Sequence, residues 1–262
     1  MVNSQKLQNP IVVLPARMAS KRLPLKPLAD IHGEPMIVHV WRRAVEADIG
    51  PVVVACGEAE IGEAIERAGG RWVLTRADHA SGSDRVFEAL GKIDPECAHD
   101  IVVNLQGDLP TIAPQAIRAV LAPLDDPNVD IATLAARIER EDEINDPHVV
   151  KVAMGVSDGE TCGTALYFSR CPVPAGDGPY YHHIGLYAFR RAALERFVGL
   201  PQTELERRES LEQLRALEAG MRIDVALVDT VPVGVDTSAD LTRAREWLGR
   251  EFLSRDDAAK PR

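Results

Sequence analysis

Short apolar runs and amphipathic segments alternate along the first half of the chain. The runs are continuous and bounded by turn residues, a pattern typical of strands that are buried on both faces. They are IVVLP (11–15), VVVAC (52–56), WVL (72–74) and IVVNLQ (101–106). Apolar residues recur at helical spacing in the segments between and beside them, which are 35–47, 58–70 and 81–93. Alternating strands and helices predict an α/β fold with a mostly parallel sheet and helices on both faces.

The pattern changes after about residue 125. Strand-like segments then follow one another without regular helices between them, which predicts an inserted antiparallel portion over roughly residues 126–190. These segments are 129–140, 149–155, 164–170 and 182–191. Helical patterns return at 193–199, 206–220 and 238–252, with one more strand at 223–228. No repeat, linker or shift in composition divides the chain, so we expect a single domain over residues 1–255 and a flexible tail over 256–262.

Composition narrows the classes of function. The 262 residues carry a formal net charge of −10, which disfavours non-specific nucleic-acid binding, because neutralising phosphates along a duplex requires a spread of Lys and Arg. The four cysteines form no CxxC pair and have no nearby His at zinc-ligand spacing, as in a reduced cytosolic protein. No apolar run approaches the ~18 residues of a membrane span. We therefore expect a cytoplasmic protein with no nucleic-acid partner and no membrane insertion.

Four cations lie in the segment that follows the first predicted strand. Arg17, Lys21, Arg22 and Lys26 stand within LPARMASKRLPLKPL, at the point where an open α/β sheet binds its ligands. Arginine can donate two parallel hydrogen bonds to a phosphate and lysine supplies a mobile point charge, so this basic loop is a candidate triphosphate site. Its prolines would stiffen it and lower the entropic cost of holding the cations together. The alternative is an ordinary solvated basic loop.

Two aspartates are candidate metal ligands. Asp108 stands in NLQGDLP at the carboxyl end of the fourth apolar run, where a hard carboxylate oxygen can coordinate Mg²⁺ that bridges substrate phosphates. Asp236, in VPVGVDTSADL, precedes the last helix and is the candidate second carboxylate. Each also has a structural interpretation, because Asp108 suits a turn that satisfies its own backbone and Asp236 suits the start of a helix. Only proximity of the two in the fold would favour the metal site.

Three further segments contain polar residues without a spacing that specifies chemistry. TRADHASGSDR (75–85) and HHIGLY (182–187) contain histidines but neither HxxxH nor HExxH. SLEQLRALEAG (210–220) has leucines at helical spacing, with Glu212 and Gln213 on other faces. On residue chemistry alone, all three segments are ordinary structural or solvated positions.

Taken together, these segments closely resemble the 3-deoxy-manno-octulosonate cytidylyltransferase family from residue 11 to about residue 248. The resemblance rests on PARMASKRLPLKPLADIHGEPMIVHV, TRADHASGSDR, VVNLQGD, ALYFSR, HHIGLYAFRR, LEQLRALEAG and GVDTSADL, in the family's order and at compatible spacing. It implies a three-layer nucleotidyltransferase fold whose inserted antiparallel part helps to bind sugar and to build a homodimer. The implied reaction transfers CMP from CTP to the anomeric hydroxyl of 3-deoxy-D-manno-octulosonate (Kdo), with release of pyrophosphate, for lipopolysaccharide biosynthesis.

The resemblance also assigns residues to roles. It implies catalytic roles for Arg17, Lys26, Asp108 and Asp236, with the two aspartates holding Mg²⁺ as the cofactor. The residues implied to bind CTP are Arg17, Arg22, Lys26, Arg76, Ser81 and Gln106. The residues implied to bind Kdo are Arg85, Arg170, His183, Tyr187, Glu212 and Gln213. A cation for the sugar carboxylate and acceptors for its hydroxyls are what such a ligand requires.

The sequence departs from the family pattern at three places. Leu25 stands where the familiar loop has Gly, Leu109 stands where an acidic residue is common, and Cys56 with Gly57 replaces a Thr-Asp pair. We expect an active enzyme with altered metal affinity, because no departure removes a residue with an implied chemical role. Two alternatives stay open: a cytidylyltransferase for another acidic sugar, such as 8-amino Kdo or sialic acid, and a noncatalytic CTP-binding relative.

Overall fold

The computed structural model describes residues 9–20, 22–157 and 159–258, with side chains described up to residue 251 of the last helix. Lys21 of the basic loop and residues 259–262 of the predicted tail lie outside these ranges. The last helix, α9 (Ser238–Ala258), extends into the segment that was expected to be a flexible tail. Among the described helices, none is both long and apolar enough to cross a membrane.

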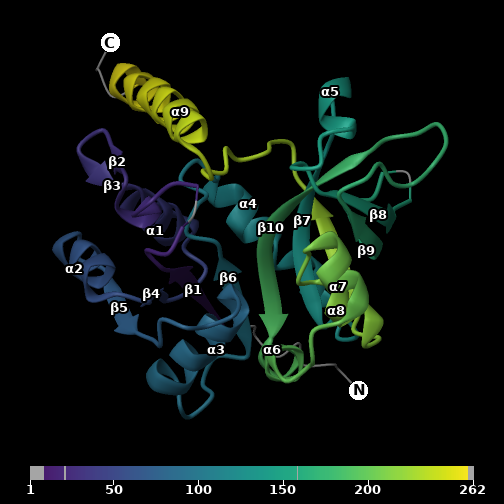
Figure 1. Cartoon of the computed structure of the whole chain (residues 1–262), viewed down its shortest axis with the longest axis horizontal. Helices are drawn as coiled ribbons and strands as arrows, with labels where there is room; N and C mark the ends of the chain where they lie inside the picture. The colour runs from purple at the N-terminus through teal and green to yellow at the C-terminus, as the bar shows by residue number, and fades with distance from the viewer. Residues whose placement is uncertain (1–8, 21, 158, 259–262) are drawn as a thin grey trace.

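One mixed sheet of nine strands runs through the described part of the chain (Figure 1). Its first four strands are parallel, in the order β5 (Arg71–Leu74), β4 (Val52–Cys56), β1 (Pro10–Ala16) and β6 (Ile101–Leu105). The order continues with β10 (Tyr181–Arg190), β7 (Ile131–Arg137), β11 (Ile223–Leu227), β9 (Cys162–Ser169) and β8 (Lys151–Gly155). β10 is antiparallel to both β6 and β7, and so joins the parallel half of the sheet to the rest.

Helices cover both faces of the parallel half, which confirms the predicted three-layer α/β fold. Val12 and Leu14 of β1 pack in one hydrophobic cluster with side chains of α1 (Met36–Ala47), α2 (Ala59–Arg67) and α4 (Pro114–Ala119). Ile11 and Val13 pack in a second cluster with side chains of α3 (Gly82–Ile93) and α6 (Arg191–Val198). Successive side chains of a strand point to opposite faces, so a strand covered on both faces has to be apolar throughout.

The second half of the sheet contains the predicted antiparallel strands. β8 pairs with β9 and β10 pairs with β7, both antiparallel. β11, which lies beyond residue 190, joins this half too, parallel to β7 and antiparallel to β9. A short helix, α5 (Glu141–Ile144), lies between β7 and β8 in the chain. Figure 1 shows the two halves side by side, with β10 between them.

The single helix predicted over residues 206–220 is wrong. Two helices occupy this region, α7 (Glu204–Glu209) and α8 (Leu214–Glu218), and the backbone between them turns through Ser210 at φ 54° and ψ 47°. A buried ion pair between Glu206 and Arg215, with contacts of 2.6 and 2.9 Å, ties the two helices together. No Gly or Pro marks the break, so the sequence alone carries no signal for it.

A third cluster secures α9 against the parallel half. Leu241 and Leu248 of α9 pack with Ile31 and Met36, and Ile31 belongs to a small hairpin of β2 (Asp30–Ile31) and β3 (Glu34–Pro35). Two short 3₁₀ helices complete the described elements, at Lys26–Leu28 and Ala122–Asp125. The N-terminus of α9 is thereby placed close to the basic loop that follows β1.

Candidate active site

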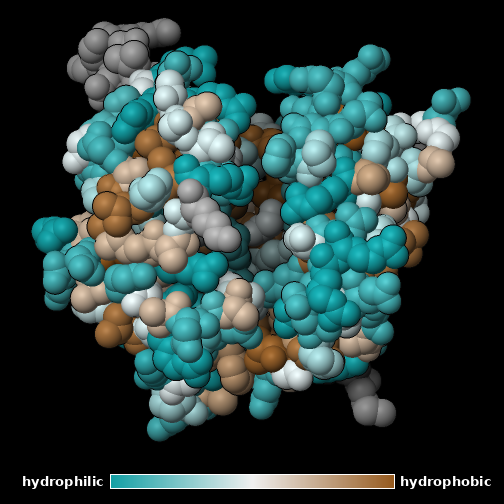
Figure 2. Space-filling view, in the orientation of Figure 1, coloured by the Kyte–Doolittle hydropathy of each residue, from teal (hydrophilic) through white to brown (hydrophobic). Residues whose placement is uncertain are grey.

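Two adjoining cavities lie at the carboxyl ends of β1 and β6. The first has a volume of about 250 Å³ and the second about 220 Å³, and Gly82 and Gln106 line both. The first is built from the parallel half, whereas the second also takes residues from β7, β10 and the α7–α8 turn. Figure 2 shows the molecular face hollowed between the two halves. The sheet therefore presents two neighbouring binding volumes where the fold type predicts ligands.

Cations of the basic loop line the first cavity. Arg17 follows β1 directly, and Lys26 begins the 3₁₀ helix that ends the loop. Leu25 precedes that helix in the left-handed conformation, at φ 56° and ψ 27°, with an exposed side chain. A non-glycine residue pays a steric cost of roughly 1–2 kcal/mol for this conformation. The turn therefore forms with Leu25 in place of the glycine of the family pattern.

Lys26 joins the two candidate metal ligands. Its Nζ lies 2.8 Å from Oδ2 of Asp108 and 3.1 Å from Oδ1 of Asp236. Arg22 contacts the same cluster through Nη2, which is 2.9 Å from Oδ2 of Asp236. Burial acts to lower the pKa of Lys26, but the two carboxylates outweigh burial and raise the pKa. Asp108 and Asp236 are 82 and 210 residues from Lys26 in sequence, yet both carboxylates contact this one cation.

The structural alternative for Asp236 is wrong. The start of α9 is capped instead by Thr237 and Asp240, because Oδ2 of Asp240 accepts hydrogen bonds from the backbone N–H groups of Asp236 and Thr237. Oγ1 of Thr237 accepts the reciprocal bond from the N–H of Asp240. The Val235 N–H also donates to the Asp108 carbonyl at 2.9 Å, which places the segment before α9 beside the segment after β6. The Asp236 carboxylate is thus directed at Lys26 and Arg22.

The donor set at this centre fits a divalent cation whose other ligands come from a bound triphosphate. Mg²⁺ is commonly held by one or two protein carboxylates together with phosphate oxygens and water. Asp108 and Asp236 supply two such carboxylates, and no cluster of three or more metal-ligating side chains occurs among the described residues. The pair is therefore suited to a substrate-bridged Mg²⁺ and not to a self-sufficient structural site.

The second cavity is largely apolar with two buried polar groups. Its walls include Ile131, Tyr187, Phe189, Phe197, Glu212 and Gln213. Oε1 of Glu212 and Nε2 of Gln213 are buried without a hydrogen-bond partner. Burial raises the pKa of Glu212 and, more strongly, that of Tyr187. Because unpaired buried polar atoms are costly, this cavity is suited to a ligand rich in hydroxyl groups that would pair with them.

His183 lies behind this cavity and does not line it. Its ring packs edge-on against Phe168, with the centroids 4.8 Å apart, and its Nε2 lies 3.0 Å from Oγ1 of Thr133. Burial, reinforced by the neighbouring His182, lowers the pKa of His183 to about 3. The imidazole is therefore neutral at physiological pH and contacts the wall residue Tyr187, at 5.6 Å between ring centroids.

Other residues implied by the resemblance lie in different places. Ser81 and Gln106 line the first cavity, and Ser81 also caps α3 in a capping box with Asp84. Arg85, assigned to the sugar, lines the first cavity and not the second. Arg76 pairs with Asp78 at the exposed surface and lines neither cavity.

Arg170 also lies outside both cavities. Its guanidinium donates to the backbone carbonyls of Glu209 (2.6 Å), Pro147 (2.9 Å) and Ser210 (3.4 Å). These contacts hold the turn that leads to the two buried polar groups of the second cavity. In this conformation Arg170 therefore supports the site without lining it.

The structure gives a physical account of two of the three sequence departures. Leu109 is buried in the main hydrophobic cluster, so the position after Asp108 faces the core. Gly57 leaves room for Arg85, because a Cβ at residue 57 would lie 3.1 Å from Nη1 and 3.3 Å from Nη2 of that side chain. The Cys56 thiol is buried, and burial raises its pKa to about 12, so it is not a nucleophile.

Sequence reasoning missed several wall residues. The apolar walls Ile131, Phe189 and Phe197 come from β7, β10 and α6, and nothing but the tertiary arrangement brings them together. It also missed a backbone group, the His79 carbonyl, which accepts a hydrogen bond of 3.2 Å from Nη1 of Arg17. A backbone acceptor leaves no signal in the sequence.

Known proteins of one family are similar to this chain along most of its length. Residues 11–223 match the cytidylyltransferase family. The 3-deoxy-manno-octulosonate cytidylyltransferase of Paramagnetospirillum magneticum is 65% identical over 239 residues, which are 91% of this chain and 97% of that protein. The protein of the same name from Rhodopseudomonas palustris is 66% identical over 238 residues, covering 91% of this chain and 97% of the relative.

Solved structures are similar as well. The structure of CMP:2-keto-3-deoxy-manno-octonic acid synthetase complexed with CTP superposes with a TM-score of 0.86 at 39% identity, covering 93% of this chain and 100% of the other. A nucleotidyl transferase from Methanothermobacter thermautotroptrophicus has a TM-score of 0.60 at 15% identity, covering 92% of this chain and 99% of the other. The second likeness concerns the fold alone.

Proposed function

This chain belongs to the cytidylyltransferase family, among the relatives named 3-deoxy-manno-octulosonate cytidylyltransferase, and from that premise we propose that it transfers CMP from CTP to the anomeric hydroxyl of Kdo. The observation that carries the proposal is the adjacency of the two cavities, which share Gly82 and Gln106. A group transfer requires donor and acceptor to be held next to each other. A cationic cavity beside one that is lined by Glu212 and Gln213, each with one buried polar atom lacking a partner, fits a triphosphate beside a polyhydroxylated sugar acid.

In the proposed reaction, the anomeric oxygen attacks the α-phosphorus of CTP. A new P–O bond forms, the bond from the α-phosphorus to the bridging oxygen breaks, and pyrophosphate leaves while the hydroxyl proton is lost to solvent or phosphate. Arg17, Arg22 and Lys26 are placed by this assignment on the triphosphate, where they offset negative charge on the transferring phosphoryl and on the leaving group. Lys26 in particular remains a cation, because its carboxylate neighbours raise its pKa.

Asp108 and Asp236 are the proposed holders of Mg²⁺. When bound, the ion neutralises phosphate charge and makes a coordinated hydroxyl easier to deprotonate. Both carboxylates pair with Lys26, so the two side chains are directed at one centre. The expected change in metal affinity rests on the charge that Leu109 removes next to Asp108, because the Leu109 side chain itself faces the core.

The sugar carboxylate requires a cation, and Arg85 is the proposed one. No Lys or Arg lines the second cavity in the described part of the chain, whereas Arg85 lines the first and is 2% exposed. It already donates to Oγ1 of Thr75 and to the carbonyls of Arg76 and Ala77, so its position is set before binding. Tyr187, Glu212 and Gln213 remain the proposed contacts for the sugar hydroxyls.

We also propose that the enzyme works as a homodimer in the cytoplasm and supplies lipopolysaccharide biosynthesis, with residues 1–255 as one domain. The support is the resemblance in sequence to the family. Light scattering of the purified 28.6 kDa chain tests the first part, because a homodimer has twice that mass. A single cooperative unfolding transition would support the one-domain organisation.

Pyrophosphate release tests the function. The purified chain is incubated with CTP and Mg²⁺ together with Kdo, 8-amino Kdo, sialic acid or no sugar. Release with Kdo alone is the expected result. Release with another sugar only would show that Kdo is the wrong ligand for the second cavity. CTP binding without release with any sugar would support the noncatalytic alternative.

A further inference from the structure

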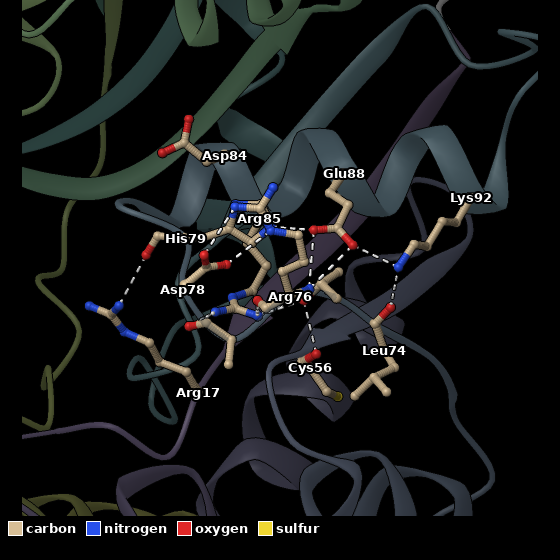
Figure 3. A network of polar contacts seen from close by, with 12 residues as sticks. Arg17, Cys56, Leu74, Arg76, Asp78, His79, Asp84, Arg85, Glu88 and Lys92 are labelled. Carbon is tan, nitrogen blue, oxygen red and sulfur yellow. Dashed lines mark hydrogen bonds and ion pairs between the residues drawn. The ribbon is translucent and has the colours of Figure 1, made fainter.

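We infer that Glu88, acting through His79, is a positioning residue for Arg17 in the CTP-binding cavity. The inference rests on the proposed function, because it takes CTP as the ligand of that cavity. Glu88 lies on α3, His79 lies in the loop before α3, and Arg17 lies after β1. Figure 3 shows the three residues in one network, which Arg17 joins through the backbone carbonyl of His79.

The Glu88 carboxylate gathers three donors. It accepts hydrogen bonds from Nε2 of His79 and from the backbone N–H of Arg76, the latter at 3.1 and 3.2 Å. Nζ of Lys92, one turn further along α3, lies 2.6 Å from Oε1, and the same Nζ donates to the Leu74 carbonyl at 2.7 Å. Glu88 therefore binds residues 76 and 79 of the segment from residue 74 to residue 79, and its partner Lys92 binds residue 74, so one helix holds the segment.

Arg85, also on α3, holds the middle of the same segment. Its guanidinium donates to Oγ1 of Thr75 and to the carbonyls of Arg76 and Ala77. Thr75 in turn donates to the Cys56 carbonyl at the end of β4, at 2.9 Å. The segment is thus attached to the sheet at one end and to α3 along its length, as the dashed lines in Figure 3 show.

The end of this segment holds Arg17. The His79 carbonyl accepts a hydrogen bond from Nη1 of Arg17 at 3.2 Å. The ring of the same histidine is hydrogen-bonded to Glu88. An arginine side chain loses rotamer freedom when it binds phosphate, and a side chain already held in place loses less. Fixing the His79 carbonyl therefore prepares the Arg17 guanidinium for the triphosphate.

The charge on Glu88 is stable in this setting. Burial acts to raise the pKa of Glu88, but hydrogen bonds from Lys92, His79 and the Arg76 N–H outweigh it and lower the pKa to about 2. The carboxylate is ionised throughout the physiological range. Charge-assisted hydrogen bonds are about twice as strong as neutral ones, so replacement by an uncharged amide should loosen every contact it makes.

The test is CTP affinity, measured by calorimetry without any sugar and with Mg²⁺ present. Glu88→Gln is expected to weaken CTP binding about tenfold. Glu63→Gln is the control, because it removes a carboxylate whose described ion pair is with Arg67 at the exposed surface of α2, and neither residue lines either cavity. His79→Ala serves as a second variant should Glu88→Gln fail to fold, and thermal melting reports the folding of each.

A double-mutant cycle separates positioning from simple destabilisation. If Glu88 acts through Arg17, the Glu88→Gln substitution should change CTP affinity little in an Arg17→Ala background. Equal effects in both backgrounds would overturn the inference, and so would unchanged CTP affinity in a folded Glu88→Gln or His79→Ala variant. CTP affinity is measured without sugar, so it tests this inference even if the chain does not react CTP with Kdo.

Discussion

Replacement of Asp108 by Asn is the most direct probe of the site, because it removes one charge and keeps the shape. In the folded protein the Asp108 carboxylate lies 2.8 Å from Nζ of Lys26, and the second carboxylate, of Asp236, lies 3.1 Å from the same atom. The substitution therefore leaves Lys26 with a partner, while the proposed Mg²⁺ site loses half of its protein carboxylates.

The expected effects on stability and on rate differ widely. At 2.8 Å the Coulomb attraction of the Asp108–Lys26 pair is roughly 6 kcal/mol at an effective dielectric constant of about 20, before desolvation is subtracted. Desolvation offsets most of it and the Asp108 side chain is 34% exposed, so the net loss of unfolding free energy should be about 1 kcal/mol or less. Loss of a charge contact made in the transition state costs about 2.7–4 kcal/mol, a fall in kcat of roughly 10²–10³-fold.

The assay is pyrophosphate release at saturating CTP, Kdo and Mg²⁺, with urea unfolding of the same preparations. Asp142→Asn is the control, since Asp142 pairs with Arg140 at the exposed surface of the antiparallel half. The metal assignment would be refuted by an Asp108→Asn enzyme that keeps more than a tenth of the wild-type kcat. A large loss of stability would show instead that Asp108 has a structural role.

Three further changes test other parts of the molecule. Glu212→Gln should raise the KM for Kdo about tenfold and leave the CTP affinity unchanged, because Glu212 lines the second cavity and not the first; equal effects on both substrates in steady-state and calorimetric measurements would contradict this. Gly57→Ala should lower stability by about 1–3 kcal/mol through crowding of Arg85, and a thermal midpoint equal to that of wild type would show that the guanidinium moves aside freely. Stability should fall as pH drops from about 6.5 towards 3, because the unfolded chain binds a proton at His183 in that window while the folded chain, whose His183 pKa is about 3, does not. Urea midpoints from pH 3 to pH 7 measure that slope, which should be shallower in a His183→Asn variant.

The alternation of apolar runs and amphipathic segments predicted the parallel half of the fold closely. Residues 11–15, 52–56, 72–74 and 101–106 lie in or directly beside β1, β4, β5 and β6. These strands can be predicted from neighbouring residues alone, since a strand covered on both faces has to be apolar along its length. The position of β10 between β6 and β7 was not predictable, because strand order depends on contacts between residues far apart in the chain.

The break at Ser210 shows a similar limit. The leucines of residues 211–217 keep helical spacing, yet the backbone turns at φ 54° because Glu206 pairs with Arg215 and Arg170 holds the carbonyls at the turn. A tertiary network overrides local propensity here. The same network directs Glu212 and Gln213 into the second cavity.

The sequence by itself determined the layers of the fold, the basic loop after β1 and the identity of the acidic residues that could hold a metal, since these follow from the pattern and chemistry of neighbouring residues. Only the tertiary structure decided which of them meet. In the structure Asp108 and Asp236 contact Lys26. Arg76 and Arg170 lie outside both cavities, and Arg85 lines the first cavity. Such contacts join residues many positions apart, and folding the whole chain is what sets their distances.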